Sequence, residues 1–411
     1  MSTARSYVIY APTPWESQRQ PLHNFADGLA LRHRVLYVDP PVSPLSPIRY
    51  GLSPSTLPRL RAVLHRRLRA AGALHVFGPL ALPPVEHPRM RSLSHPLVRT
   101  QIARAVAQAG MRAPIVIATR GMPELVGAAG ESLRVGMFVD HPSAGAALMG
   151  RDAADLEAQA SAIHASTDML ITTSHSLVPL FAERGWHSEA VPAGFPADLA
   201  PAYDQAREPP EYGTLPRPLL GYTGSVDDRL DFDTILALAD RFSGGSVVFV
   251  GAVSPRLPAS AREALSSRAN IHLLGLRPRT QLPAYVRYLD VALLPYEDSV
   301  FTRYQSPMKF WEYLYAGPPI VGLGSAELRR HPAPLVSYAE NPETALALVE
   351  QALADRASGA QERRRFALAN TWEDRANQLD ELIAARIARG PSEALGEPST
   401  PAPATTPVAT P

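Results

Sequence analysis

The feature that most constrains this chain is an alternation of short apolar runs with helical patterns, which occurs in two successive series. Strands that alternate with helices are typical of a parallel sheet covered by helices. The strands expected in the first series span residues 7–10, 35–38, 74–77, 115–118, 135–139, 169–172 and 190–192. Those expected in the second series span residues 219–222, 246–250, 271–274, 291–294, 320–322 and 335–338. The pattern therefore predicts an α/β fold with two doubly wound, Rossmann-like domains.

Stretches without periodicity set the expected domain boundaries. Residues 195–217 mix Pro, Ala, Glu and Tyr without a repeat, which indicates a linker. We expect an N-terminal domain over residues 1–200, a linker over 201–217 and a C-terminal domain over 218–388. Residues 389–411 are rich in Pro, Thr and Ala and poor in large apolar side chains, so we expect a disordered tail there. Two domains that face each other create a cleft, where ligands commonly bind.

Composition excludes several classes of partner and site. The net charge of +1 gives no global attraction to nucleic acid, so we expect no nucleic-acid partner. The absence of cysteine excludes disulfides, thiolate metal ligands and thiol nucleophiles. The chain contains neither a Walker A sequence nor a full Gly-x-Gly-x-x-Gly fingerprint. This argues against a P-loop NTPase and makes a dinucleotide enzyme less expected.

Two features of the sequence bear on location. The N-terminus has no secretory h-region, and no apolar run approaches the ~20 residues that a membrane helix needs, so we expect a cytoplasmic protein. Residues 60–69, which begin with Leu60 and end with Arg69, place apolar side chains at helical spacing among cationic ones. A basic amphipathic helix of this kind fits either a peripheral contact at the inner face of a membrane or a solvated helix face.

One segment, Ser-Pro-Met-Lys-Phe-Trp-Glu-Tyr-Leu-Tyr-Ala-Gly-Pro-Pro-Ile-Val, combines helix signals with a charged pair. Ser306 can cap a helix whose first position holds a proline, and Gly317 with two prolines ends it about three turns later. Lys309 and Glu312 lie three residues apart and so share one face of this helix. That face therefore offers a cation and a carboxylate to a ligand.

Lys309 is also the single lysine of the chain, since the other 39 of its 40 Lys and Arg residues are arginines. A compositional bias that replaced lysine by arginine wherever either serves would leave lysine only where arginine does not serve. A compact ammonium that binds phosphate as a point charge is one such case. Chance retention of one lysine is the alternative explanation.

Loops at the carboxyl ends of parallel strands gather ligands in a doubly wound sheet. Asp140 and His141 directly follow the strand expected at 135–139, where a general base or an electrostatic helper could stand. The alternative is an aspartate that caps the next turn beside a histidine without a role. Gly224 and Ser225 follow the first strand of the second series, where a glycine turn lets backbone amides approach an anion.

The Ser-Pro-Met-Lys segment resembles the Pro-x-Lys-x-x-Glu-Tyr-Leu-Ala-x-Gly-x-Pro-Val-Val segment of GT-B glycosyltransferases, especially bacterial ones similar to the teichuronic acid and other GT4-like cell-envelope transferases. The likeness extends over most of the chain, through Trp15 with residues 31–41, residues 166–174 and residues 289–295. It implies a GT-B architecture and a nucleotide-sugar donor on the C-terminal domain.

The donor-binding residues that the resemblance implies are Gly224, Ser225, Ser306, Lys309, Glu312 and Arg277. Glu312 would hold the ribose hydroxyls and Lys309 would face the diphosphate, while the region of Arg277 would lie near the base. An Asp-x-Asp sequence at Asp231 and Asp233 resembles a metal motif of another class of sugar transferases, but its place at a helix start favours capping. We therefore expect no metal and no other cofactor.

Two departures from the family pattern leave the stereochemistry open. Tyr304 stands where the commoner signature has a glutamate, eight residues before Glu312. The family's Asn-Gly-Val-Asp segment before the linker is replaced by residues 193–196, Ala-Gly-Phe-Pro. The sequence thus leaves open whether such a transferase would retain or invert the configuration of the sugar.

The leading hypothesis is a hexosyltransferase that moves a sugar from a nucleotide-sugar donor to a cell-envelope, polysaccharide or lipid-linked acceptor. One alternative keeps the fold and changes the reaction to that of a UDP-sugar 2-epimerase. Another is a GT-B-like subunit without catalysis that supports an active partner. The sequence does not name the sugar, the base, the acceptor or the linkage.

Overall fold

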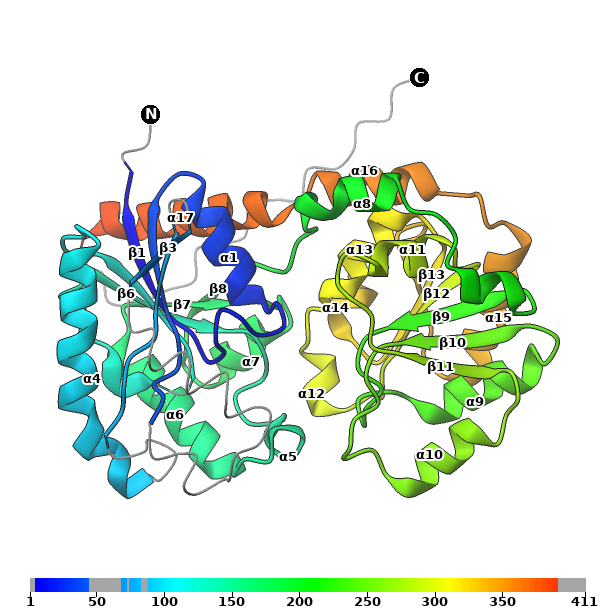
Figure 1. The fold of residues 1–411 in the computed structure, drawn as a ribbon, viewed down its shortest axis with the longest axis horizontal. Helices are drawn as coiled ribbons and strands as arrows, with labels where there is room; N and C mark the ends of the chain where they lie inside the picture. The colour runs from blue at the N-terminus through cyan, green and yellow to red at the C-terminus, as the bar shows by residue number, and fades with distance from the viewer. Residues whose placement is uncertain (1–3, 44–67, 72–73, 83–87, 121, 391–411) are drawn as a thin grey trace.

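The computed structural model describes residues 4–43, 68–71, 74–82, 88–120 and 122–390. They form two parallel-dominated β-sheets, one in each half of the chain, each covered by helices (Figure 1). The expected tail falls outside these residues from position 391 onward. Both sheets are close-packed, since strands such as β9 (Leu219–Thr223) and β10 (Ser246–Val250) are buried along their whole length.

The N-terminal sheet has the strand order β3-β4-β2-β1-β5-β6-β7-β8, and all neighbouring pairs are parallel except β3 and β4. Its strands are β1 (Ser6–Tyr10), β2 (Arg34–Val38), β3 (Arg69–Ala71), β4 (Leu74–Phe77), β5 (Ile115–Ala118), β6 (Leu133–Phe138), β7 (Met169–Thr172) and β8 (Ser188–Ala190). The expected strands are confirmed, although β8 ends where the sequence pattern placed its start. Parallel strands buried on both faces read as continuous apolar runs, which is why the sequence reveals them.

Strand β3 corrects one sequence-based expectation. We expected Arg69 to end a basic amphipathic helix over residues 60–69, but it begins β3 and pairs antiparallel with Val76 of β4. Backbone pairing with β4 makes this segment the edge strand of the sheet, so helical spacing in the sequence does not decide its conformation. Residues 60–67 lie outside the described part of the chain.

The C-terminal sheet has the order β11-β10-β9-β12-β13-β14 and is parallel throughout. Its remaining strands are β11 (Ile271–Gly275), β12 (Val291–Pro295), β13 (Ile320–Leu323) and β14 (Ser337–Tyr338). The order reverses between β9 and β12, and ligands of doubly wound sheets bind at such a switch point. In the N-terminal sheet the corresponding reversal lies between β1 and β5.

The helices cover both sheets and connect their strands. They are α1 (Pro21–Ala30), α4 (Pro88–Gln108), α5 (Ala146–Met149), α6 (Ala153–Ser166), α7 (Leu177–Glu183), α8 (Ala200–Asp204), α9 (Phe232–Arg241), α10 (Ala259–Ser266), α11 (Leu282–Arg287), α12 (Val300–Arg303), α13 (Met308–Ala316), α14 (Ala326–Arg329), α15 (Pro342–Ala354), α16 (Ala360–Leu368) and α17 (Trp372–Arg389). A short break separates α16 from α17. Thr371 begins the second helix by accepting a hydrogen bond from the Asp374 amide.

Helix α17 returns to the N-terminal half and packs against α1, as Figure 1 shows. A side chain at Gly28 would have its Cβ 2.6 Å from the Cβ of Ala376, and the rings of Phe25 and Trp372 meet at 5.2 Å. The sequence analysis assigned these residues to the C-terminal domain because they follow its last strand. The contacts place this helix on the N-terminal half instead.

The two chain segments that connect the halves run side by side. The Phe195 amide donates to the Asn370 carbonyl at 2.8 Å, and the Trp372 amide donates to the Phe195 carbonyl at 3.0 Å. The segment leaving the N-terminal half and the segment returning to it therefore form one paired crossing. Any motion of one half relative to the other must pass through this hinge.

Candidate active site

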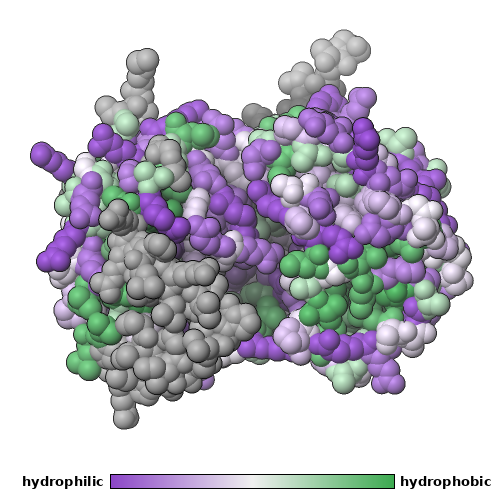
Figure 2. Space-filling view, in the orientation of Figure 1, coloured by the Kyte–Doolittle hydropathy of each residue, from purple (hydrophilic) through white to green (hydrophobic). Residues whose placement is uncertain are grey.

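A cleft separates the two halves, and Figure 2 shows the surface hollowed between them. Loops from both halves meet there. The ring of His141, after β6, lies 5.5 Å from the ring of Tyr304, after α12. A Cβ added to Gly145 would lie 2.6 Å from a ring carbon of Phe301. His141, one of the predicted site residues, thus lies where the two halves meet.

Helix α13 begins one residue later than the sequence suggested. Its N-cap is Pro307, which offers no side-chain hydrogen bond, so the expectation that Ser306 caps the helix is wrong. The Ser306 hydroxyl instead accepts a hydrogen bond from the Ala193 amide of the hinge at 3.3 Å. Gly317 ends the helix in a left-handed conformation with φ of 99°, as expected.

Lys309 lies in a confined space at the end of strand β9. Its Nζ atom is 5.0 Å from the ring centroid of Tyr222 and 6.0 Å from that of Tyr296, and both tyrosines are buried. A Cβ added to Gly224 would lie 2.7 Å from the Lys309 Cε and 2.8 Å from its Nζ. Gly224 also has a φ of +146°, which side chains rarely adopt. The structure thus brings the lysine and the glycine turn together.

This confinement explains why position 309 holds a lysine in an arginine-rich chain. A guanidinium is planar and wider than an ammonium, and it needs room for its fork of donors. The backbone of Gly224 and the two tyrosine rings leave little space beyond the Lys309 ammonium. Ser225, next to the glycine, is half-exposed and so accessible from the cleft.

A hydrogen bond ties helix α13 to the end of β9. The Tyr313 hydroxyl accepts from the Thr223 amide at 2.7 Å and lies 3.2 Å from the Thr223 Oγ1 atom. Tyr313 is fully buried. The helix that carries Lys309 is therefore fixed to the strand whose turn carries Gly224.

Glu312 is half-buried one turn beyond Lys309 and accepts a hydrogen bond from the Tyr203 hydroxyl at 3.3 Å. Burial raises the pKa of this carboxyl, while the charges of Arg279 and Lys309 act in the opposite direction. Tyr203 belongs to helix α8 in the expected linker and is itself buried. No local sequence pattern points to Tyr203, because it lies 109 residues from Glu312 in the chain.

His141 is buried and its Nδ1 atom accepts hydrogen bonds from the amides of Ser143 at 3.2 Å and Ala144 at 3.0 Å. Burial, together with the charge of Arg184, lowers the pKa of the ring, so it is neutral at physiological pH. A neutral ring whose Nδ1 accepts carries its proton on Nε2. His141 is therefore arranged as a hydrogen-bond donor rather than as a base.

Asp140 is half-buried, and burial raises the pKa of its carboxyl. Arg120 of the same half and Arg229 of the opposite half counteract this shift, and Gln305 forms a hydrogen bond to the carboxylate. Arg120 also donates to the His141 carbonyl at 3.1 Å. The surroundings of Asp140 thus include groups from both sides of the cleft.

Arg229 is a second cation on the C-terminal side that the sequence analysis missed. It donates from Nε to the Asp227 Oδ1 atom at 2.8 Å and from Nη2 to Oδ2 at 2.7 Å. Because Arg229 lies within an aspartate-rich run, the sequence suggests an acidic partner for it. Its position near Asp140 of the opposite half could not be predicted from the sequence.

Arg277 is held at a different place from the Lys309 cluster. Its guanidinium donates to the Glu211 carboxylate at 3.0 Å and to the Tyr285 hydroxyl at 2.8 Å. The arginine whose charge acts on Glu312 is Arg279, which pairs with Asp198 at 3.2 Å. The structure does not place Arg277 beside the other predicted donor-binding residues.

Solved structures with the same arrangement of halves cover almost the whole chain. Anabaena Alr3699/HepE in complex with UDP and glucose matches with a TM-score of 0.65 at 13% identity, over 93% of this chain and 100% of that one. A UDP-forming trehalose-phosphate synthase from Burkholderia xenovorans matches with a TM-score of 0.63 at 14% identity, over 95% and 100%. The chain has the GT-B fold.

Two further matches are named as glycosyltransferases. WaaG, a glycosyltransferase involved in lipopolysaccharide biosynthesis, matches with a TM-score of 0.57 at 15% identity, over 92% of this chain and 99% of that one. A candidate teichuronic acid biosynthesis glycosyltransferase of Bacillus subtilis (strain 168), TuaH, is 29% identical over 104 residues. That match spans 25% of this chain and only 26% of the relative. No protein-family model matches the chain.

The Asp-x-Asp sequence caps a helix, as expected. Asp231 is the N-cap of α9 and accepts from the Thr234 amide at 3.0 Å, while Asp233 lies in the first turn. The described part of the chain holds no group of three His, Cys, Asp or Glu residues arranged for a metal ion. Over the same residues, no helix is both long and apolar enough to cross a membrane.

Proposed function

We propose that this protein is a hexosyltransferase that uses a nucleotide-sugar donor and a cell-envelope, polysaccharide or lipid-linked acceptor. The observation that carries the proposal is the cluster at the switch point of the C-terminal sheet. There the Lys309 ammonium lies against the Gly224 turn, and Glu312 follows on the same helix. A cation, accessible backbone and a carboxylate are what a diphosphate and a ribose require.

The departing nucleoside diphosphate develops negative charge as the glycosidic bond to the donor breaks. Lys309, the Ser225 amide and the nearby Arg229 would stabilise that charge. The Gly224 amide is not available, because it donates to the Val250 carbonyl at 2.9 Å. Glu312, held by Tyr203, would accept hydrogen bonds from the ribose hydroxyls. In this proposal the protein's own cations carry the charge, and no metal takes part.

The N-terminal side would act on the transferred sugar and the acceptor. The Nε2 proton of His141 can be donated to a hydroxyl of the sugar in the cleft. Asp140, beside it, is the carboxylate nearest to this donor in sequence and would help to orient the acceptor. A lipid-linked acceptor would bring the protein to the inner face of a membrane.

The named relatives support the direction of the proposal. HepE is bound to UDP and glucose, and the curated relative is assigned to teichuronic acid biosynthesis. Both are consistent with a nucleotide-sugar donor and an envelope polysaccharide. The choice of UDP as the first nucleotide to test rests on these relatives.

The proposal is tested by incubating the purified protein with radiolabelled nucleotide sugars and a membrane extract. We expect label to move to an acceptor, or the donor to hydrolyse slowly, with at least one donor. Absence of both with all common donors would contradict the proposal. Analysis of the donor without acceptor separates the epimerase alternative, which would change the sugar while leaving it attached to the nucleotide.

A further inference from the structure

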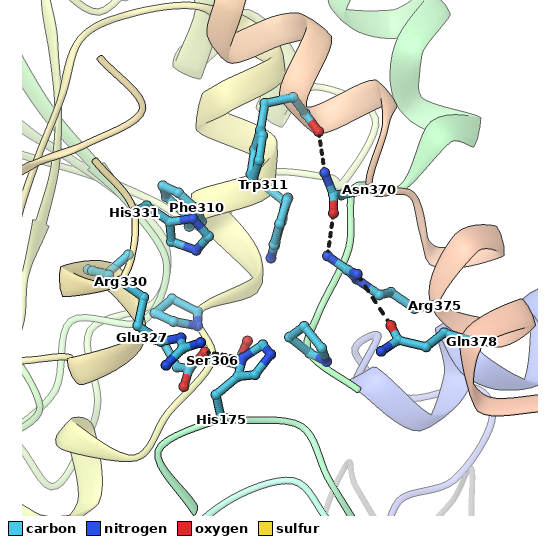
Figure 3. A pocket seen from close by; sticks show the side chains of 14 residues that line it. His175, Ser306, Phe310, Trp311, Glu327, Arg330, His331, Asn370, Arg375 and Gln378 are labelled. Carbon is cyan, nitrogen blue, oxygen red and sulfur yellow. Dashed lines mark hydrogen bonds and ion pairs between the residues drawn. The ribbon is translucent and has the colours of Figure 1, made fainter. Parts of the chain in front are cut away.

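A cavity of about 270 Å³ lies at the hinge end of the cleft, behind the start of helix α13 (Figure 3). Its lining comes from both halves and from the segments that connect them. The N-terminal half contributes His175 and the hinge contributes Pro192. The C-terminal half contributes α13 and α14, and the returning chain contributes α16 and α17. Ser306, one of the expected donor-binding residues, also lines the cavity, whereas Lys309 and Glu312 do not, so the cavity adjoins the proposed donor site without including its charged pair.

One wall of the cavity offers hydrogen-bond donors that have no partner. Among the described residues, no side-chain hydrogen bond or ion pair involves Arg330, which is exposed after α14. The ring nitrogens of His331 also have no hydrogen-bond partner there, although its ring packs against Phe310 at 4.7 Å. His175 uses Nδ1 for Glu327 at 3.2 Å, which leaves Nε2. Figure 3 shows Arg330 and His175 on the same side of the cavity.

Glu327, the one acid among the residues that line the cavity, is already saturated. It accepts from the Ser174 hydroxyl at 3.0 Å and from the amide and hydroxyl of Ser176 at 2.8 and 3.1 Å, in addition to His175. Burial would raise the pKa of this carboxyl, but these donors outweigh burial and lower it. The hydrogen-bonding capacity of this carboxylate is thus met from within the protein. The groups on this wall that can still form hydrogen bonds are donors, which suit a ligand rich in acceptors.

An aromatic part of the lining adjoins this wall, because the His331 ring lies 4.7 Å from Phe310 and 5.9 Å from Trp311, and it ends in a polar rim. Phe310 and Trp311 are buried against Phe366, whose ring is stacked on Trp311 at 5.7 Å. On the rim, Arg375 donates to the Asn370 side chain at 2.7 Å and lies 5.3 Å from the Trp311 ring centroid. No carboxylate pairs with Arg375 among the described residues, so its charge also favours an anion in the cavity.

We propose that this hinge cavity is a binding site for a small organic anion, a phosphate or carboxylate. Its charged head lies at Arg330 and His175, and its body lies against Phe310 and Trp311. The cavity is smaller than the ~300–1,000 Å³ typical of drug-sized ligands, which selects a molecule well below a nucleotide sugar in size. Because both halves line the cavity, a bound anion stabilises one relative position of the halves.

The test is a calorimetric titration of the full chain, with saturating UDP present to occupy the donor site. The probes are phenyl phosphate and benzoate, which carry a head and a planar body, together with inorganic phosphate and uncharged phenol. The test variant is Arg330→Gln. The control is Arg329→Gln, which removes the same charge from the neighbouring residue, where the arginine pairs with Glu340 on the surface. We expect at least one of the two anions to bind more tightly than phenol and inorganic phosphate. Arg330→Gln should weaken that binding about tenfold, and Arg329→Gln should not.

The relative affinities of phenyl phosphate and benzoate decide which head the cavity prefers. Equal affinity in Arg330→Gln and Arg329→Gln would overturn the proposal. The proposal would also be overturned if none of the probes bound. Ligand-observed NMR would check such a result, because binding can occur without a measurable heat. Titration of the same proteins with UDP alone reports separately on the proposed function, because none of these substitutions touches Lys309 or Glu312.

Discussion

The two sides of the cleft are built in different ways. On the C-terminal side, Lys309 and Glu312 lie on one helix, and Tyr313 fixes that helix to the strand that ends at the Gly224 turn. On the N-terminal side, Asp140 is influenced by Arg229 and Gln305 from the opposite half. The pair of Lys309 and Gly224 thus lies within one domain, whereas the surroundings of Asp140 depend on how the halves meet.

This difference suggests a division of roles. A site complete within one domain can hold a ligand while the cleft is open. A site that needs both domains is complete only when they approach, which suits a step that must exclude water. We therefore assign donor binding to the C-terminal side and the transfer step to the N-terminal side. The predictions below test this division, in order of decreasing expected effect.

The largest effect is expected for His141→Ala, and it should appear in transfer alone. Removing one preorganised hydrogen-bond donor lowers kcat about 10²–10³-fold, while UDP affinity should change less than about twofold. His187→Ala removes an exposed histidine of the same half and serves as the control. Steady-state transfer rates and UDP calorimetry measure the two quantities. Loss of UDP affinity equal to the loss of rate would break the division.

Lys309→Ala should show the opposite pattern, with UDP affinity lost about 10–100-fold. A hydrogen bond to a charged group contributes about 1.5–3 kcal/mol, and about 1.4 kcal/mol corresponds to a tenfold change in affinity. Lys309→Arg should also weaken UDP binding, because Gly224 and the tyrosine rings leave little room for a guanidinium. Arg303→Ala, which removes a surface cation paired with Asp298, is the control. UDP affinity in Lys309→Arg equal to wild type would contradict the steric explanation.

The difference between the two sides of the cleft also explains which site residues could be predicted from the sequence. Lys309 and Glu312 were recognisable because three residues separate them on one helix, and the strands were recognisable as continuous apolar runs. Ser306 was misjudged because its partner Ala193 lies 113 residues away in the chain. Tyr203 and helix α17 were not placed for the same reason, since pairings across the fold leave no local pattern.

The prediction for Arg69 failed through competition between two patterns. Leucines at helical spacing favoured a helix, but an antiparallel edge pairing with Val76 decided the backbone there. The tautomer of His141 was also beyond the sequence. It follows from the amides of Ser143 and Ala144, whose direction depends on the loop after β6.

Tyr203→Phe should reduce UDP affinity about 2–10-fold. Its hydroxyl holds the Glu312 carboxylate, and a neutral hydrogen bond contributes about 0.5–1.5 kcal/mol. Tyr212→Phe is the matched control, because that hydroxyl donates to the Tyr285 carbonyl instead. UDP calorimetry of both variants checks the prediction. An equal loss in the two variants would indicate a general loss of linker structure rather than positioning of Glu312.

The smallest effect concerns pH. Because burial raises the pKa of Glu312, UDP affinity should begin to fall, as pH is lowered, above the pH at which an ordinary glutamate gains a proton. A raised folded-state pKa also means that this group favours the folded state at low pH and loses that contribution as pH rises through the raised value. Glu312→Gln should therefore be more stable than wild type at pH 8, with the difference diminishing towards pH 4. Thermal unfolding across this range would contradict the assignment if the difference were independent of pH.

The central claim is that the C-terminal half alone holds the nucleotide, and hydrogen exchange of the full chain with and without UDP tests it most directly. We predict the strongest slowing of exchange in peptides that cover residues 222–226 and 306–313, with little change at residues 139–145. Slowing confined to residues 139–145, or spread equally over both sides while UDP is bound, would contradict the account.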